Sequence, residues 1–303
     1  DFNFLSLEKT AVKDYSLVFR ANFDGTAKAK KNGKLIVDKL KVKAGEKTII
    51  NSQLKANSDN NFKVTILPDR NQNLTEDKKI TKSLKVEMKT YRSEKNIYVS
   101  PEGSPEAKGS REDPLDVDTA VAFSLPGQKI ILIDGHYLRN EKLEIKRYND
   151  GTKKRNRYLV AEEGTNPIFD FDQNSKGIIL SADYWHIKGI NVTRSAANEN
   201  GMRIGGSHNI IENSRFYDNG GTGLQISSTD DKEARDQWPS YNLILNSTAF
   251  DNVDPSNNNA DGFAAKITAG EGNLFKGCIS HNNIDDGWDL YTKVGSGAIG
   301  KVV

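Results

Sequence analysis

The sequence predicts an all-β protein, a right-handed parallel β-helix with a short N-terminal capping helix, preceded by a small β-sandwich domain. Apolar residues recur in short runs separated by Asn, Gly, Asp and Ser, a pattern typical of many short strands. From Trp185 onward the sequence repeats itself, which is typical of a solenoid. Charge is unevenly divided, because residues 1–95 carry 21 Lys and Arg against 12 Asp and Glu, whereas residues 96–303 carry 22 against 29. These observations predict a β-sandwich domain over 1–95 and a β-helix domain over 96–303.

The composition limits the class of protein. A chain of 303 residues can bury a substantial core without disulfides, and the single Cys278 cannot form an internal one. No apolar run approaches the length of a transmembrane span. The chain opens at Asp1 without Met or the apolar core of a signal peptide, which we interpret as a processed or trimmed N-terminus. The basic excess of the first domain fits association with an acidic polymer, although a solvated, Lys-rich strand face is the commoner cause.

Alternating apolar and polar residues predict the β-sandwich. Strands are expected at 15–19, 34–37, 47–50 and 62–67. Gly25, Gly33, Gly45 and the polar stretch 57–61 supply the turns. This domain contains no chemical motif that we recognise.

The β-helix domain begins with a strand at 96–101 and a loop rich in Gly, Ser and Pro. Apolar residues three and four apart then predict a helix within 114–123, with Asp116 as its N-cap. Pro126 and Gly127 end it before a strand at 129–133. Such a helix would cover the open apolar end of the first coil.

Four repeats can be aligned, each with three short strands and an Asn-rich turn. They begin at Trp185, His208, Tyr241 and Gly272. After the first strand each has a small or amide residue, namely Gly189, Asn213, Asn246 and Gly277. In the third strands, period-two alternation sends one set inward, Met202, Leu224, Phe263 and Trp288. The other set is expected to face solvent, and it consists of Arg203, Gln225, Ala264 and Asp289.

Two further features follow from the alignment. Asn219, Asn252 and Asn283 coincide in their turns, which predicts a stacked Asn ladder bonded to neighbouring coils. The coil that contains Tyr241 is lengthened at 230–240 and 254–259. Because insertions in solenoids map to the binding face, we expect these loops to form the wall of a groove.

An aspartate cluster is the main candidate for chemistry. Asp261 precedes the third strand of its coil, and Asp286 has the same position one coil later, with Asp285 before it and Asp289 on the following strand. Stacked coils lie about 4.8 Å apart, so these carboxylates would repel one another unless protonated or neutralised by a cation. Oxygen ligands without Cys or His favour calcium over zinc. Asp-Gly pairs are also ordinary turn residues, and only their alignment between coils favours a site.

Two segments resemble a known family. Asn-Ala-Asp-Gly-Phe-Ala-Ala-Lys at 259–266 and Asp-Asp-Gly-Trp-Asp-Leu at 285–290 resemble the signature of family 9 polysaccharide lyases, which comprise pectate lyases and related rhamnogalacturonan lyases. The resemblance runs from about Tyr98 to the end and does not cover residues 1–95. It implies a secreted, extracellular bacterial enzyme that uses calcium to cleave pectic polyuronate by β-elimination, giving 4,5-unsaturated products. The implied calcium ligands are Asp261, Asp285, Asp286 and Asp289.

The same resemblance bears on partners and on the catalytic base. The implied partner is an acidic plant cell-wall polysaccharide, with no nucleic acid and no membrane, and the complete protein is expected to be a monomer. In the family the base is a lysine on a later coil. Residues 298–303 read as the opening strand of another coil and Lys301 does not match, so we expect that lysine beyond Val303. Lys266 and Arg203 are predicted to face outward and bind substrate carboxylates, although Lys266 could equally be merely solvated.

Several alternatives stay open. Galacturonan and rhamnogalacturonan cannot be distinguished as substrates, and a non-catalytic carbohydrate-binding β-helix or adhesin would also explain a chain without an assigned base. An inverting pectin hydrolase would need paired acid and base carboxylates, and its usual Gly-His-Gly and Arg-Ile-Lys motifs are absent. The histidines have no obvious partners in the sequence, so we assign structural roles to His136, His186, His208 and His281.

Overall fold

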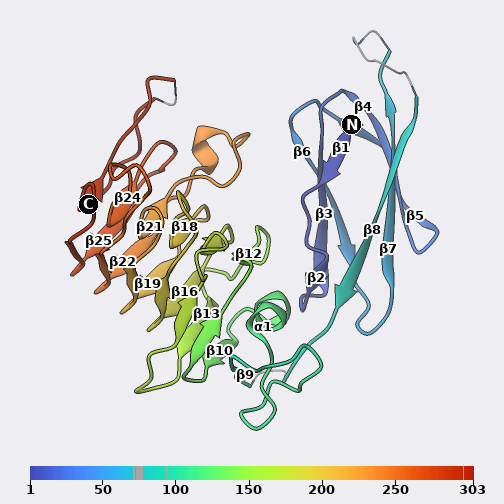
Figure 1. Cartoon of the computed structure of the whole chain (residues 1–303). Coiled ribbons are helices and arrows are strands. Elements are labelled where there is room, and N and C mark those ends of the chain that lie inside the picture. The colour runs from blue at the N-terminus through green and yellow to red at the C-terminus, as the bar shows by residue number, and fades with distance from the viewer. Residues whose placement is uncertain (71, 73–77, 93–94, 296) are drawn as a thin grey trace. The chain divides into compact units, whose positions relative to one another are not determined.

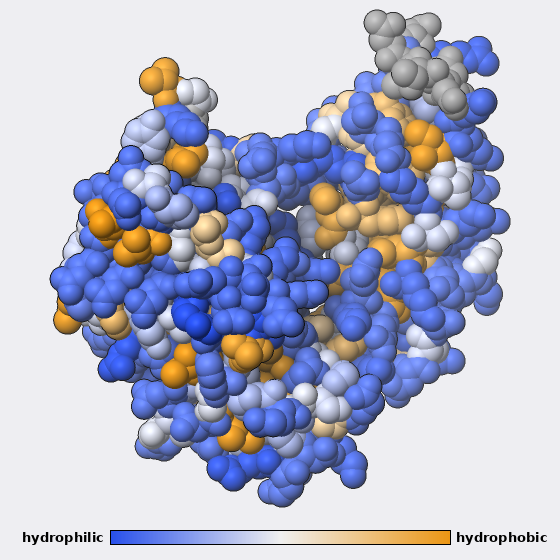
Figure 2. Space-filling model, viewed as in Figure 1, coloured by the Kyte–Doolittle hydropathy of each residue, from blue (hydrophilic) through white to orange (hydrophobic). Residues whose placement is uncertain are grey.

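A computed structural model describes residues 1–70, 72, 78–92, 95–295 and 297–303. The chain divides into two compact units, Asp1–Thr90 and Tyr91–Val303, and each is described by itself (Figure 1). Hydrophilic side chains cover most of the face of each unit that Figure 2 shows. No described helix has the length and apolar character needed to cross a membrane.

The first unit is a β-sandwich, as predicted. One sheet has the order β1-β3-β6 and the other the order β2-β8-β7-β4-β5. The strands are β1 (Phe2–Phe4), β2 (Lys9–Thr10), β3 (Asp14–Ala21), β4 (Gly25–Lys31), β5 (Lys34–Val42), β6 (Lys47–Gln53), β7 (Asn60–Pro68) and β8 (Ile80–Met88). Alternate residues of the strands point into one core, where Phe19, Phe62 and Ile66 are fully buried.

The second unit is a parallel β-helix of three sheets, again as predicted. The first sheet contains β9 (Ile97–Val99), β10 (Lys129–Leu132), β13 (Arg157–Ala161), β16 (Trp185–Lys188), β19 (Ile210–Glu212), β22 (Leu243–Leu245) and β25 (Leu274–Lys276). The second contains β11 (His136–Leu138), β14 (Ile168–Asp170), β17 (Asn191–Thr193), β20 (Arg215–Tyr217), β23 (Thr248–Phe250) and β26 (Ile279–His281). The third contains β12 (Leu143–Ile145), β15 (Ile178–Leu180), β18 (Met202–Ile204), β21 (Leu224–Ile226), β24 (Phe263–Ala265) and β27 (Trp288–Asp289). A short 3₁₀ helix, η1, spans Arg235–Gln237.

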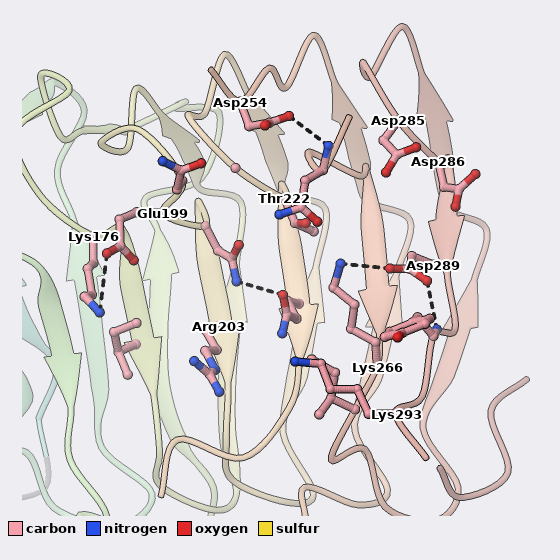
Figure 3. Close-up of a pocket in the computed structure, with 18 residues that line it drawn as sticks. Lys176, Glu199, Arg203, Thr222, Asp254, Lys266, Asp285, Asp286, Asp289 and Lys293 are labelled. Atoms are coloured by element: carbon pink, nitrogen blue, oxygen red, sulfur yellow. Dashed lines mark hydrogen bonds and ion pairs between the residues drawn. The ribbon is translucent and has the colours of Figure 1, made fainter. Parts of the chain in front are cut away.

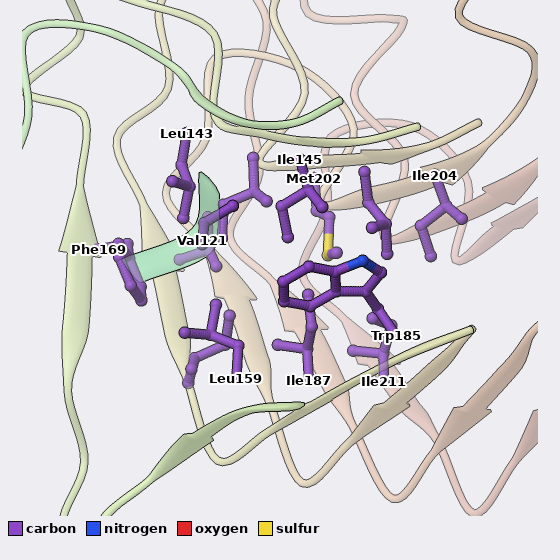
Figure 4. Close-up of a cluster of buried hydrophobic side chains, with 14 of the residues drawn as sticks. Val121, Leu143, Ile145, Leu159, Phe169, Trp185, Ile187, Met202, Ile204 and Ile211 are labelled. Carbon is purple, nitrogen blue, oxygen red and sulfur yellow. The ribbon is translucent and has the colours of Figure 1, made fainter. Parts of the chain in front are cut away.

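The capping helix is confirmed as α1 (Val117–Phe123). The Asp116 carboxylate accepts a hydrogen bond from the Thr119 backbone N–H at 2.8 Å, so it is the predicted N-cap. Val121 of this helix belongs to the apolar cluster that fills the coils around the fully buried Trp185 (Figure 4). The helix therefore contributes to the same core as the strands.

The predicted strand alignment is confirmed, but the solvent exposure of its outward set is wrong. Met202, Leu224, Phe263 and Trp288 pair in one register along the third sheet. In the outward set, Gln225 and Ala264 are buried, and Arg203 is only partly exposed. One reason is that side chains on this face bond to neighbouring groups, which alternation within a strand cannot indicate. Asn200 Nδ2 donates to Gln225 Oε1 at 3.1 Å, and Arg203 donates to the Ser228 carbonyl. In the inward set, Trp288 is 44% exposed, because among the described residues β27 pairs with β24 alone.

The four aligned small or amide residues share a backbone conformation. Gly189, Asn213, Asn246 and Gly277 have φ of 76°, 50°, 49° and 65°. This is the left-handed region, which Gly and Asn adopt at least cost. The repeat therefore conserves a turn between the first and second strands of each coil.

The histidines do have partners, contrary to our expectation from sequence. His136 Nε2 lies 2.7 Å from Asp170 Oδ2, and His186 Nε2 lies 2.8 Å from Glu212 Oε2. The imidazole of His208 stacks between the rings of Tyr184 and Tyr241. His281 stacks on Phe250. The carboxylate partners of His136 and His186 stand two residues beyond the register partner on the next strand, whereas the rings that stack on His208 and His281 belong to directly neighbouring coils. The structural roles are therefore those of coil-to-coil contacts.

The Asn ladder is confirmed, and a second ladder that we did not predict runs through Asn209, Asn242 and Asn273. Asn252 is fully buried. Its Nδ2 donates to the Phe216 carbonyl at 3.2 Å and to Asn283 Oδ1 at 2.8 Å, while its Oδ1 accepts from the Asn219 backbone N–H at 3.1 Å. The ladder thus connects three successive coils.

Replacing Asn252 by Ala should lower the free energy of unfolding by about 3 kcal/mol, because several buried polar groups would lose their partners at once. Urea-induced unfolding measures this loss. The control is Asn166→Ala, which removes an exposed amide with no hydrogen bond in the described part of the chain and should cost less than about 0.5 kcal/mol. Equal losses in the two variants would contradict a special role for the ladder.

Asp150 makes the stability depend on pH. Burial, which outweighs the hydrogen bond from the Asp183 backbone N–H, raises the pKa of Asp150 from 3.8 to about 6. A folded pKa above the unfolded value stabilises the fold at low pH, and this contribution is lost as the pH rises through about 6. Asp150→Asn keeps an acceptor oxygen and removes the charge. We therefore expect urea unfolding to give a gain of about 1–3 kcal/mol at pH 7 and little difference near pH 4. The same gain at both pH values would refute this assignment.

Candidate metal centre

The register between two coils brings the aspartates together. The backbone N–H of Gly262 donates to the Asp286 carbonyl at 2.9 Å, and that of Phe263 donates to the Gly287 carbonyl at 3.0 Å. Asp261 and Asp286, each just before a strand of the third sheet, are therefore held side by side. Asp261, Asp285 and Asp286 each offer a carboxylate oxygen, and these oxygens all lie within 4.8 Å of one another.

Asp261 is the buried member of this group, with 1% of its surface exposed. Its Oδ2 accepts from Thr222 Oγ1 at 3.0 Å and from Lys266 Nζ at 2.7 Å. Its Oδ1 is also buried and has no hydrogen-bond partner among the described residues. A buried carboxylate oxygen without a partner is costly, so a cation is the natural partner for it. The all-oxygen donor set fits a hard divalent ion such as calcium.

Lys266 lies on the outer face, as expected, and lines the groove beside the aspartates. The alternative that it is merely solvated is wrong, because the residue is only 8% exposed. Its Nζ lies 2.7 Å from Asp261 Oδ2 and 2.8 Å from Asp289 Oδ2. Burial alone would lower the pKa of Lys266, but the hydrogen bonds and charges of these two carboxylates outweigh it and raise the pKa. The ammonium is therefore an internal counterion.

Asp289 and Asp285 have different environments. Asp289 does not belong to the group of three; its Oδ2 accepts from Lys266, and its Oδ1 accepts from the Tyr291 backbone N–H at 2.8 Å. Asp285 is exposed, and its pKa is raised by desolvation and then by the charges of Asp261, Asp286 and Asp289. Unbalanced negative charge thus remains around Asp285 despite the ammonium of Lys266.

The cluster lies at one end of a groove of about 620 Å³ along the third sheet (Figure 3). Of the two loops expected to form its wall, the loop 254–259 contributes Asp254 and Asn259. The loop 230–240 does not line the groove, because its Glu233 is buried against Arg147, with an N–O distance of 2.8 Å. That loop therefore packs against earlier coils instead.

Arg203 lies along the same groove, away from the aspartates (Figure 3). In the register of the third sheet it is separated from Asp289 by Gln225 and Ala264. Three steps between strands amount to about 14 Å. Its guanidinium donates to the Ser228 carbonyl, while its Nε has no partner in the part of the chain that the structure describes.

Sequence reasoning missed Thr222, which fixes Asp261. Thr222, Asp261 and Asp286 each stand immediately before the first Gly of a third strand, as Asn200 does. This polar column was visible in the alignment of the repeats. We overlooked it because we compared only the charged members.

The second unit is thus a right-handed parallel β-helix with carboxylates gathered in a groove on one of its sheets. The chain belongs to the Pel9A-like right-handed β-helix family, whose profile matches residues 97–303. Residues 3–89 match the central Ig-like domain of pectate disaccharide-lyase.

Among curated proteins, pectate lyase L of Thermoclostridium stercorarium is 54% identical over 299 residues, which is 99% of this chain and 24% of that protein. Pectate disaccharide-lyase of Dickeya chrysanthemi is 35% identical over 95% of this chain and 36% of that protein. The chain thus spans about a quarter to a third of the length of these relatives. The crystal structure of pectate lyase Pel9A matches with a TM-score of 0.59 and 32% identity, over 66% of this chain and 51% of that one.

Proposed function

We propose that this chain is part of a calcium-dependent polysaccharide lyase that cleaves pectic polyuronate, such as polygalacturonate, outside the bacterial cell. The observation that carries the proposal is the group of three carboxylates around the unpartnered Oδ1 of buried Asp261 in an open groove. The names of the relatives, pectate lyase and pectate disaccharide-lyase, support the substrate class.

In the proposed site, Asp261, Asp285 and Asp286 would hold calcium, and Asp289 would stand beside them as the fourth predicted ligand. Calcium supplies a positive charge that neutralises a uronate carboxylate and stabilises the enolate-like charge that forms when the C5 proton is removed. Thr222 and Lys266 orient Asp261 for this task through their hydrogen bonds. Arg203 binds a second uronate carboxylate farther along the groove.

The reaction is a β-elimination. A base removes the C5 proton, the electron pair forms the C4–C5 double bond, and the bond from C4 to O4 breaks as O4 receives a proton. The base must be neutral before it acts. Lys266 is unsuited to this role, because its two carboxylate partners raise its pKa and so keep it protonated. We therefore assign Lys266 the role of positioning Asp261, and we expect another lysine of the complete protein to act as the base.

Product analysis tests the proposal. The whole gene product, incubated with polygalacturonate and separately with rhamnogalacturonan, should release unsaturated uronides that absorb in the ultraviolet, and a chelator should abolish their release. Saturated reducing ends alone would indicate a hydrolase and refute the lyase assignment.

Calorimetry on Asp286→Ala tests the metal site separately. A calcium affinity equal to that of the parent would rule out the proposed metal site.

A further inference from the structure

A second groove, of about 510 Å³, lies on the outer face of the five-stranded sheet in the first unit. Five lysines line it, and we call it the lysine groove: Lys28, Lys30, Lys39, Lys63 and Lys79. All five are exposed. Asp38 is the single acidic residue among its described lining residues, so the groove is strongly cationic.

The arrangement of these charges costs stability. Lys30 of β4 pairs directly with Lys63 of β7 in the antiparallel register. Like charges directly opposite each other on one face of a sheet are destabilising. Lys28 has a weak ion pair with Asp38, at 3.9 Å, whereas in the described ranges the other four lysines have none. The sheet therefore contains a like-charge pair whose repulsion a bound anion would relieve.

The floor of the groove suits a sugar better than a base or an apolar side chain. Thr65 and Thr81, on adjacent strands, bond to each other through their hydroxyls at 2.9 Å, and Leu67 beside them is 55% exposed. Hydroxyls and an aliphatic side chain can contact the polar edge and the apolar face of a pyranose ring. Among the described residues that line the groove there is no Arg and no aromatic ring, the groups on which nucleic-acid bases stack.

We propose that the lysine groove binds a linear polyuronate without calcium, through its carboxylates. The identity of the polymer rests on the proposed function, but the binding does not depend on the metal centre. Lys30 and Lys63 lie on neighbouring strands, which are about 4.8 Å apart, and the other three lysines line the same groove, so several ammonium groups face a polymer that carries many carboxylates. A tethered binding surface of this kind raises the concentration of polymer near the β-helix.

The test measures binding of the chain to immobilised polygalacturonate in the presence of a chelator, so that the metal centre makes no contribution. The parent protein should bind. Lys30→Gln/Lys63→Gln should weaken binding on the order of five- to twentyfold, because each exposed ion pair contributes a factor of up to about five. This variant should be at least as stable as the parent to heat, because it removes the repulsive pair.

A matched control removes the same charge elsewhere in the unit. Lys13 and Lys55 are exposed and do not line the lysine groove. Lys13→Gln/Lys55→Gln should change the affinity less than about twofold, and fully methyl-esterified polygalacturonate, which lacks the charges, should not bind the parent. Equal weakening in both double variants, no binding in chelator, or binding of duplex DNA as tight as that of polygalacturonate would each overturn the proposal. Because no turnover is measured, failure of the lyase assignment would leave the binding result unaffected.

Discussion

Replacing Asp261 by Asn should lower the affinity for calcium at least about 100-fold and abolish calcium-dependent lyase activity. The reason is that Asp261 is the one buried carboxylate of the group of three, and its Oδ1 has no other partner among the described residues. A neutral amide oxygen in its place would bind calcium more weakly than the charged carboxylate oxygen does. An amide oxygen can still accept from Thr222, so the fold should persist. Isothermal titration with calcium measures the affinity, and circular dichroism checks the fold.

The control for this variant is Asp251→Asn. Asp251 is exposed, carries the same charge and occupies the left-handed backbone conformation, with φ of 55°, that Asn also adopts readily. The Asp251→Asn variant should bind calcium with the same affinity as the parent. A comparable loss in Asp251→Asn would mean that net charge, and not the Asp261 site, governs the affinity.

Replacing Lys266 by Met should destabilise the calcium-free protein by about 3 kcal/mol or more. Removing one partner of a buried ion pair leaves uncompensated charge, and here two carboxylates, Asp261 and Asp289, lose the same ammonium. Calcium should restore most of this stability, because it binds the folded state and replaces the missing positive charge. Denaturant unfolding in chelator and in excess calcium measures both quantities.

The matched control is Lys188→Met. Lys188 is 46% exposed at its side chain and pairs with Glu212, so its loss should cost less than about 1 kcal/mol with or without calcium. If Lys266→Met were as stable as the parent in chelator, Lys266 would not be the internal counterion.

The repeat and the ladder of Asn219, Asn252 and Asn283 could be predicted because they are local signals that recur in the sequence. Period-two alternation placed Leu224 and Phe263 in register, and one turn position per coil carried Asn252 and its neighbours. The direction of a long side chain is not such a signal. Alternation placed Lys266 on the outer face correctly, but it could not show that the long, flexible side chain would be buried with its ammonium between carboxylates of two coils.

The prediction that the loop 230–240 lines the groove was wrong for a different reason. Its path is fixed by the contact between Glu233 and Arg147, which are 86 residues apart. A pairing of that kind leaves no trace in composition or spacing. The loop 254–259, by contrast, is held by its own residues, since the Asp254 carboxylate accepts from the Ser256 and Asn259 backbone N–H groups at 2.9 Å. The position of the loop 254–259 could therefore be predicted from its local sequence.

No single coil contains the metal centre. Asp261 comes from one coil and Asp285 and Asp286 from the next, while β24 and β27 pair through only two residue pairs. An ion that bound all three carboxylates would join these two coils across the third sheet. The amide protons of Phe263 and its neighbours should then exchange with solvent at a rate set by the free calcium concentration. The local stability of the pairing between β24 and β27 would follow the calcium level of the surroundings.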